Sequence, residues 1–211
     1  MAIRGINTQV EVQATLDTPK TITGITKASV AVATSTAHGY ANGDVVLLSV
    51  VGMVQLNGVA CRVANVTANT LELEGIDSTN FNTFTSGTAT EIATWNTFDS
   101  LTNISLPNAS PAELDQTTIH DNQLQNTFGL PGAPTGTMSG QFDPLDTAVA
   151  NLRTATLNSA NRVFRITFEN GVKAIFNATP AAGQGFDLPV NAIATAQYSL
   201  TVRGFVNFYA S

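Results

Sequence analysis

The sequence has little charge, one cysteine and two histidines. Charged residues make up 11% of its 211 residues, well below the roughly 25% of an ordinary soluble domain. Nine Lys and Arg stand against fifteen Asp and Glu, a net charge of -6, which disfavours a surface that binds phosphate groups tightly. The lone Cys61 excludes an internal disulfide, and no Cys or His cluster has metal-ligand spacing. We therefore expect no redox role, no structural metal and no cofactor.

Long apolar runs are also missing. The longest, Val45–Val54, is interrupted by Ser49 and Gly52 and falls well short of the roughly 20 residues that span a bilayer. The first ten residues have neither the charged nor the apolar region of a signal peptide. We expect synthesis in the cytoplasm and no membrane partner.

Thr, Asn, Ser and Ala are abundant instead. A polar surface with few charges suits a protein that is covered largely by copies of itself, and it suits a Thr-rich β protein equally well. The length allows one large domain, or one medium domain that carries a small one.

Alternating polar and apolar residues, separated by turn residues, predict a mainly β fold. Residues 8–16 alternate as a half-buried strand does. Residues 22–92 consist of short β runs between turns, with Asn-Gly pairs at Asn42-Gly43 and Asn57-Gly58 that favour tight hairpins. These runs predict a small all-β barrel or sandwich, inserted into a larger domain that comprises residues 1–21 and 93–211.

The second half of the chain begins with a long polar segment between two predicted strands, at residues 94–106 and 135–142. Residues 113–134 of this segment show no periodicity, so we expect no regular structure there. Loops of this length are uncommon in compact domains unless they have a function or are disordered when free. The segment is either an arm that contacts a partner or a mobile surface loop.

One helix is predicted, at about residues 143–157, with Asp143 as its N-cap and Pro144 at its first position. An apolar stripe at helical spacing would pack it against a sheet. The residues of this stripe are Leu145, Ala148, Val149 and Leu152.

A β-hairpin and a long final strand complete the predicted fold. Residues 163–168 and 172–178 flank the turn sequence Glu169-Asn170-Gly171, which favours a tight hairpin. Residues 194–208 alternate throughout, and so long a strand needs a partner, which a neighbouring subunit could supply. Its apolar side would carry Tyr198, Leu200, Val202, Val206 and Phe208.

The order strand, long loop, strand, helix, Asn-Gly hairpin and long terminal strand resembles the major tail tube proteins of lambda-like, long-tailed bacteriophages. The sequence Arg-Val-Phe-Arg-Ile-Thr-Phe-Glu-Asn-Gly at 162–171 lies at the centre of this resemblance, which covers residues 8–17 and 94–211. It implies a β-sandwich or barrel with the helix packed outside. It also implies hexameric rings, stacked end to end, whose inner sheets join around a channel. The chain differs from the lambda relative in having no C-terminal immunoglobulin-like domain and in carrying its insert earlier.

Residues 22–92 resemble a second module. The segments that carry the similarity are Ile-Thr-Gly-Ile-Thr at 22–26, His-Gly-Tyr-Ala-Asn-Gly-Asp at 38–44, Leu-Asn-Gly at 56–58 and Val-Ala-Asn-Val-Thr-Ala-Asn-Thr at 63–70. They are similar to the small β-barrel related to the first catalytic-cysteine half-domain of ubiquitin-activating enzymes, which recurs in phage tail proteins. That half-domain is not the site of adenylation, so the resemblance implies a decoration of the tube and no ubiquitin-related activity.

The tube resemblance places contacts between subunits in three segments, at residues 1–9, 113–134 and 205–211. The residues that we expect at these contacts are Arg4, Ile6, Ile119, His120, Gln123, Leu124, Phe128, Phe205, Phe208 and Tyr209. Acidic groups on the channel wall would keep passing DNA from adhering. The acidic candidates for the wall are Asp99, Glu113, Asp115, Asp121, Glu169 and Asp187, although acids that face outward are the commoner case.

Candidates for nucleophilic catalysis are weak. A Ser or Cys hydrolase needs a base within reach of its nucleophile, and the only histidines are His38 and His120. His38 precedes a Gly-Tyr turn, and His120, beside Asp121, fits an exposed loop histidine better than a pH sensor. Cys61 lies in an apolar run and is best explained as a small core residue.

Two further patterns have simpler explanations than a binding site. Glu72 and Glu74 share one face of a strand, which fits a solvated face better than a pair of catalytic acids. The sequence Gly183-Gln184-Gly185 follows no strand-to-helix pattern and indicates a turn, not a dinucleotide loop.

The sequence therefore predicts a structural protein of the virion tail, assembled in the host cytoplasm, and not an enzyme. Its partners would be copies of itself, the tail terminator, distal tail and tape measure proteins, and double-stranded DNA in passage. The alternative is a receptor- or glycan-binding tail accessory protein whose small barrel recognises a cell surface. The rings available to bind a sugar there are few: Tyr40, Phe81 and Phe84.

Overall fold

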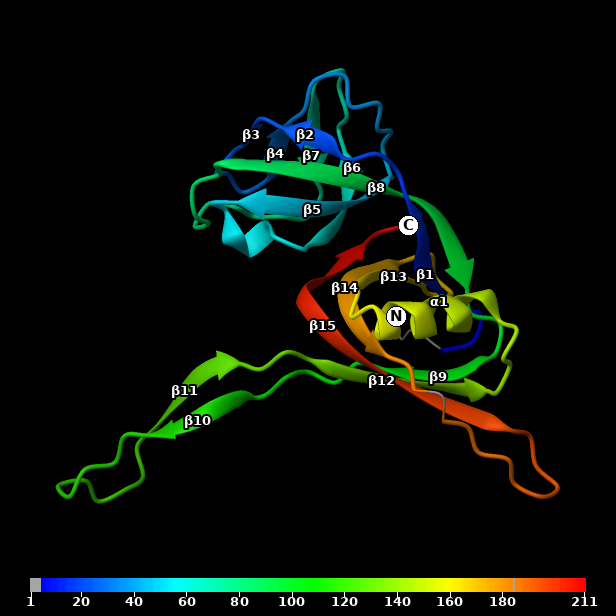
Figure 1. The fold of residues 1–211 in the computed structure, drawn as a ribbon. Helices are drawn as coiled ribbons and strands as arrows, with labels where there is room; N and C mark the ends of the chain where they lie inside the picture. Colours follow the sequence, from blue (N-terminus) through cyan, green and yellow to red (C-terminus); the bar gives the residue numbers. More distant parts are fainter. Residues whose placement is uncertain (1–4, 184) are drawn as a thin grey trace.

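The computed structural model describes residues 5–183 and 185–211. Figure 1 shows an upper lobe and a lower body, with two arms that project from the body in different directions. We use "lobe" for residues 20–92 and "body" for the described residues of 5–19 and 93–211. Within these ranges no helix is long and apolar enough to cross a membrane.

The lobe is built from short strands joined by turns. Its elements are β2 (Lys20–Ile22), β3 (Gly24–Ile25), β4 (Ala31–Thr34), β5 (Val45–Val51), a 3-10 turn η1 (Val54–Leu56), β6 (Ala60–Ala64) and β7 (Thr70–Leu73). One strand, β8 (Ser86–Thr97), begins in the lobe and ends in the body.

The body combines longer strands with one α-helix and a projecting hairpin. Its further elements are β1 (Gln9–Leu16), β9 (Leu101–Ser105), β10 (Pro111–Asp115), β11 (Asn126–Pro131), β12 (Thr135–Gln141), α1 (Thr147–Leu157), β13 (Arg162–Thr167), β14 (Lys173–Ala181) and β15 (Thr195–Tyr209). The predicted mainly β fold with one packed helix is confirmed.

Hydrogen bonds link the strands into one long antiparallel path. In the lobe the order is β3-β4-β7-β6-β5-β8, with β2 on the other edge of β8. The path continues through the body as β8-β1-β13-β14-β15-β12-β9. The predicted hairpin is present, since β13 and β14 pair from Arg162↔Ala178 to Thr167↔Lys173. The boundary that the sequence places after residue 92 falls inside β8, and the division into two domains stays a prediction.

The body sheet curves around its own hydrophobic core, and α1 closes the core. Side chains from β1, β12, β13, β14, β15 and α1 meet there, with the rings of Phe164 and Phe176 stacked at 5.5 Å between centroids. Strand β9 lies beside β12 in the sheet. The chain just before β9 approaches β12 closely at Gly140, where a Cβ atom would overlap the carbonyl oxygen of Ser100. We call the side of the sheet that faces this core the core face, and the opposite side the outer face.

The lobe has a separate core, drawn from residues 22–89, and it is fastened to the outer face of the body. A third apolar cluster joins Val45, Ala60 and Ile92 of the lobe to Val163, Ile175 and Tyr209 of the body. The amide of Asn177 donates to the carbonyl oxygen of Gly58 at 2.8 Å, and that of Asn207 donates to Ala60 at 2.9 Å. These buried contacts lie over β13 and β14, so they leave β9 and β12 uncovered.

The helix begins later than the sequence predicts. Its N-cap is Asp146, whose carboxylate accepts hydrogen bonds from the backbone N–H groups of Ala148 and Val149. Asp143 instead accepts from the N–H of Leu145 in a preceding turn. Leu145 therefore lies outside the helix and is 87% exposed, so its assignment to the apolar stripe is wrong, whereas the buried stripe is completed by Ala155.

The final strand finds its partners within its own chain. Residues 195–201 of β15 pair with β12, and residues 199–209 pair with β14. Gly204, with φ +74°, lies in an irregular stretch that inserts two extra residues relative to β14. Tyr198, Leu200 and Val202 are buried as predicted, but Phe208, beyond this stretch, is 66% exposed.

Candidate functional site

The structure brings none of the weak catalytic candidates together. Cys61 is fully buried, and burial raises the pKa of its thiol to about 12. The Nδ1 atom of His38 accepts from the backbone N–H of Tyr40 at 3.0 Å, inside the lobe. Glu74 forms an ion pair with Arg62, while Glu72 accepts from Asn65. Among the described residues, no group of three His, Cys, Asp or Glu side chains could hold a metal ion.

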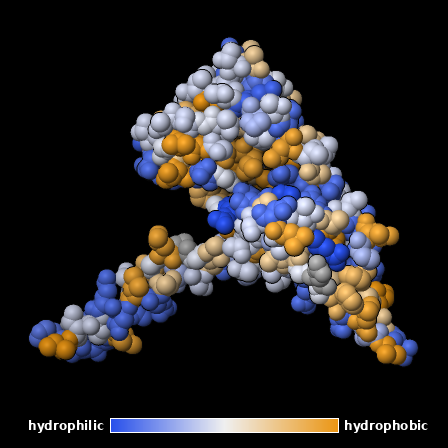
Figure 2. All heavy atoms as spheres, in the orientation of Figure 1, coloured by the Kyte–Doolittle hydropathy of each residue, from blue (hydrophilic) through white to orange (hydrophobic). Residues whose placement is uncertain are grey.

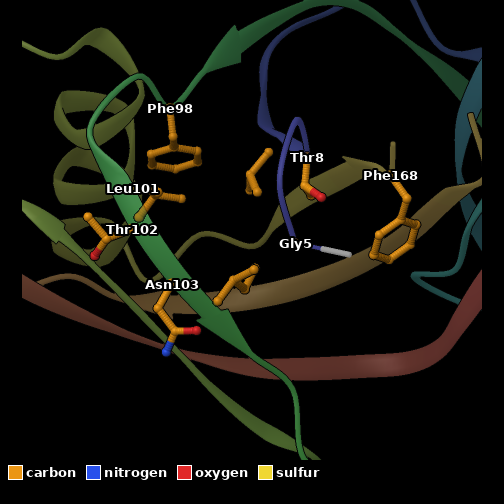
Figure 3. Close-up of a pocket in the computed structure, with 9 residues that line it drawn as sticks. Gly5, Thr8, Phe98, Leu101, Thr102, Asn103 and Phe168 are labelled. Carbon is orange, nitrogen blue, oxygen red and sulfur yellow. The ribbon is translucent and has the colours of Figure 1, made fainter. Parts of the chain in front are cut away.

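A pocket of about 360 Å³ opens at the end of the body core (Figure 3). Phe98 and Leu101 point into it from the β8–β9 connection and the start of β9, and Phe168 from just after β13, with Thr102 and Asn103 on β9 at its side. Its described lining contains no acid, base or thiol, and hydroxyl and amide groups alone do not provide the base that nucleophilic catalysis needs.

The segment 113–134, expected to lack regular structure, forms a projecting β-hairpin. Strands β10 and β11 pair from Pro111↔Pro131 to Asp115↔Asn126, as a sheet of their own. We call residues 111–131 the hairpin arm. The arm has no buried side, so polar and apolar residues need not alternate along its strands. The sustained alternation that predicts a strand is therefore absent from this segment.

The hairpin arm exposes apolar side chains on both of its faces. Phe128 and Leu130 lie on one face, and Leu114, which is opposite Thr127, lies on the other. At the tip, Ile119 is 97% and Leu124 is 76% exposed. Figure 2 shows orange patches along both arms, away from the body. Exposed apolar groups gathered in this way are typical of surfaces that bind a partner.

Two carboxylates shape the tip of the hairpin arm. Asp115 accepts from the backbone N–H of Thr117 at 2.8 Å, and Asp121 accepts from the N–H and the hydroxyl of Thr118 at 2.7 and 2.9 Å. Because these bonds favour the ionised form, they lower the pKa of both carboxyl groups. The tip is therefore apolar and negatively charged at neutral pH.

The second arm, residues 185–194, was not recognised from the sequence. It connects β14 to β15 and carries four exposed apolar side chains at Phe186, Leu188, Val190 and Ile193. The Phe186 ring packs against Phe142 at 4.7 Å between centroids. The signal was present as Phe186, Leu188 and Val190 at alternate positions, followed by Ile193. Pro189 between them argued against a strand, so the segment indicated only a connection.

The structure places most of the predicted contact residues at the surface. Those on the hairpin arm are exposed: Ile119, His120, Gln123, Leu124 and Phe128. Ile6, Phe205 and Phe208 are also exposed, and Arg4 lies outside the described residues. Their role in contacts stays a prediction.

Tyr209 is used within its own chain. It is 3% exposed, and its hydroxyl oxygen accepts from the backbone N–H of Arg62 at 3.0 Å. The Arg62 guanidinium also lies 4.8 Å from the centre of the Tyr209 ring. Tyr209 therefore fastens the end of β15 to the lobe and offers no surface to another subunit in this conformation.

The six acidic candidates for a channel wall are all exposed, but none lies on a strand of the large sheet. Glu113, Asp115 and Asp121 belong to the hairpin arm, and Asp187 belongs to the second arm. Asp99 and Glu169 lie in the turns after β8 and β13. Whether any of them faces a channel stays a prediction.

A broad uncharged surface lies between the two arms, on the outer face of β9, β12 and β15. Cross-strand rows such as Ser105–Thr137–Ser199 run across it. Its residues are all exposed or half-buried: Asn103, Ser105, Thr135, Thr137, Ser139, Gln141, Thr195, Gln197, Ser199 and Thr201. We call this surface the uncharged face. In these three fully described strands the only charged residue is Arg203, which lies beyond the face, where β15 approaches the lobe.

The uncharged face could have been recognised in part from the sequence. Thr, Ser and Gln occupy alternate positions of Thr135–Gln141 and again of residues 195–201, as expected for one face of each strand. The sequence does not show that these strands are neighbours, because β12 pairs with β15 across more than fifty intervening residues.

Comparison with known families gives a match over most of the chain. A family model described as phage tail tube protein matches residues 51–211, which include all of the body from β9 onward and the second half of the lobe. No curated protein matches the chain.

Proposed function

The chain belongs to the phage tail tube protein family, and from this premise we propose that its copies assemble into stacked hexameric rings that form a hollow tube. As a member of this family it is a structural protein of the virion tail and not an enzyme. We further propose a long-tailed, siphovirus-type virion, assembly in the host cytoplasm, and passage of the viral genome through the tube. Tail terminator, distal tail and tape measure proteins would meet the same tube.

The family match over residues 51–211 carries this proposal, and the arms support it. A monomer exposes Ile119, Leu124 and Phe128 on a hairpin without a core of its own. Covering these side chains with a partner lowers the free energy, because apolar surface leaves the water. The two arms and the body give each subunit different surfaces on different sides. A closed ring needs this, because each subunit contacts its two neighbours through two different surfaces. We propose the hairpin arm, Ile6, Phe205 and Phe208 as contacts between subunits.

We propose that the lobe is a decoration of this tube, related to the small barrel described above. A glycan platform is less well supported, because the rings of the lobe are part of its own packing. Tyr40 is buried and donates its hydroxyl to the carbonyl oxygen of Ala89 at 2.7 Å, and Phe81 and Phe84 pack against the lobe core.

Electron microscopy of the purified protein tests the function. We expect rings and tubes with a central channel. A double variant, Ile119→Ser with Leu124→Ser, should remain unassembled because it removes apolar surface from the arm tip. Both side chains are exposed, so the circular dichroism spectrum and the melting temperature should not change.

The matched control is Val51→Ser with Val54→Ser, which removes apolar side chains that are each 61% exposed on the lobe. This variant should assemble as the wild type does. Normal tubes from the arm variant would show that the tip makes no essential contact. Wild-type protein that stays monomeric at high concentration and binds host cells would contradict the proposed tube function.

A further inference from the structure

We infer that the uncharged face lines the channel of the assembled tube, as a wall of hydroxyl and amide groups along which duplex DNA slides without binding. The inference rests on the tube proposed above and adds to it which surface faces the channel and what its chemistry is.

The position of the lobe selects this surface. The lobe covers the outer face of the body over β13 and β14, through the buried cluster around Ile175 and the bond from Asn177 to Gly58. In Figure 1 the lobe and strands β9 and β12 lie on opposite sides of the body. A lobe of some seventy residues fits on the wide circumference of a ring and not on the narrow one. The opposite side, which carries Thr137 and Thr201, then faces the axis.

The composition of this surface separates it from the contact surfaces. The cores of protein interfaces are enriched in aromatic residues, Met and Arg and depleted in Ser. The arms carry Phe128 and Phe186 together with exposed Leu and Ile side chains, whereas the uncharged face has no aromatic, Met or Arg residue among its ten members. The arms are therefore suited to burial between copies, and the uncharged face is suited to water.

An uncharged wall also explains how DNA would pass. Non-specific affinity for DNA comes almost entirely from Lys and Arg side chains that release counterions from the phosphates. The exposed rows Ser105–Thr137 and Thr135–Thr201 provide no such cation. The six acidic candidates lie on the arms and in turns, off the strands of this face, so the proposed wall contains no carboxylate. It avoids adhesion because it lacks a cation.

Cysteine labelling of assembled tubes tests this placement. Thr137→Cys on β12 and Thr201→Cys on β15 introduce a thiol at exposed positions of the face, and Ser29→Cys introduces one in an exposed turn of the lobe. The native Cys61 is fully buried, so it should contribute little background. Each variant is treated with a large polyethylene glycol maleimide, before and after assembly, and separately with N-ethylmaleimide. Modification is measured by gel shift and by mass spectrometry.

Before assembly, all three variants should react with both reagents. In tubes, Thr137→Cys and Thr201→Cys should lose the polyethylene glycol shift but still react with N-ethylmaleimide, because the small reagent diffuses through a water-filled channel. Ser29→Cys should keep both reactions.

Two results would overturn the inference while leaving the tube intact. A retained polyethylene glycol shift at Thr137→Cys and Thr201→Cys would place the face outside. Loss of both reactions would place it in a contact between subunits. Failure of wild-type protein to form any tube would instead reject the function on which the inference rests.

Discussion

At the scale of single residues, many polar side chains of this chain serve the turn in which they lie. Asp77, Asp115 and Asp121 each accept hydrogen bonds from a Thr residue two or three positions away. Such local bonds hold a turn without a core, which matters most in the hairpin arm. The bonds of Asp115 and Asp121 form within the arm itself, so they hold the shape of its tip without a partner.

We predict that Thr118→Ala raises the pKa of Asp121 only part of the way to its ordinary value of 3.8. The backbone N–H of Thr118, which is the larger cause of the lowered pKa, remains in the variant. Because the folded pKa is lowered, the stabilisation of the tip is present above pH 3.8 and is lost as the pH falls through the folded pKa. NMR titration of the Asp121 carboxyl carbon measures this shift. Thr118→Ser should leave it low, and an unchanged value in Thr118→Ala would show that the hydroxyl bond does not form in solution.

At the scale of elements, the start of the helix depends on which of two aspartates, Asp143 or Asp146, acts as its N-cap. Asp143 and Asp146 are both good N-cap residues. Asp146 caps the helix, and the Ser100 hydroxyl also donates to it at 3.3 Å, so the body fixes its carboxylate in place. Starting the helix there lets Ala148, Val149, Leu152 and Ala155 face the core together.

Substitution of the two aspartates separates the caps. Asp146→Ala should reduce the free energy of unfolding by about 1 kcal/mol, the usual cost of losing an N-cap. Asp143→Ala should change it by less than about 0.5 kcal/mol, as for most surface substitutions. Urea unfolding followed by circular dichroism measures both values. A larger loss of stability in Asp143→Ala than in Asp146→Ala would show that Asp143 is the N-cap, as the sequence alone predicts.

At the scale of the whole molecule, the lobe and the body are fastened together by covalent continuity and by buried contacts. Strand β8 pairs with β5 in the lobe and with β1 in the body. The end of β15 reaches the lobe through Tyr209, Asn207 and the carbonyl oxygen of Ala210, which accepts from Arg62 at 2.9 Å. A lobe held in this way keeps a fixed orientation relative to the body.

We predict that lobe and body unfold in a single calorimetric transition, with equal calorimetric and van't Hoff enthalpies. Tyr209→Phe should destabilise the whole molecule by about 1 kcal/mol, because the partly buried N–H of Arg62 loses its acceptor. Tyr198→Phe is the matched control, since the buried Tyr198 hydroxyl has no hydrogen-bond partner in the described part of the chain. This control should leave the melting temperature nearly unchanged. Two separate transitions in the wild type would show that the lobe moves independently.

The sequence by itself determined the features that depend on neighbouring residues. Alternation identified strands, the Asn170-Gly171 pair identified the β13–β14 hairpin, and the lack of charge and of reactive clusters argued against an enzyme. Strand alternation and turn chemistry act over a few residues, so they can be read without knowledge of the fold.

Only the tertiary structure decided which surfaces are free. The hairpin arm has no buried side, so its sequence shows no sustained alternation of polar and apolar residues. Asp146 caps the helix because the surrounding body holds its carboxylate in place. Tyr209 is buried against the lobe, so it is not available at the surface. The uncharged face exists because β12 and β15, distant in sequence, lie side by side, and because the lobe covers the neighbouring strands instead. Burial depends on long-range packing, which local sequence patterns do not encode.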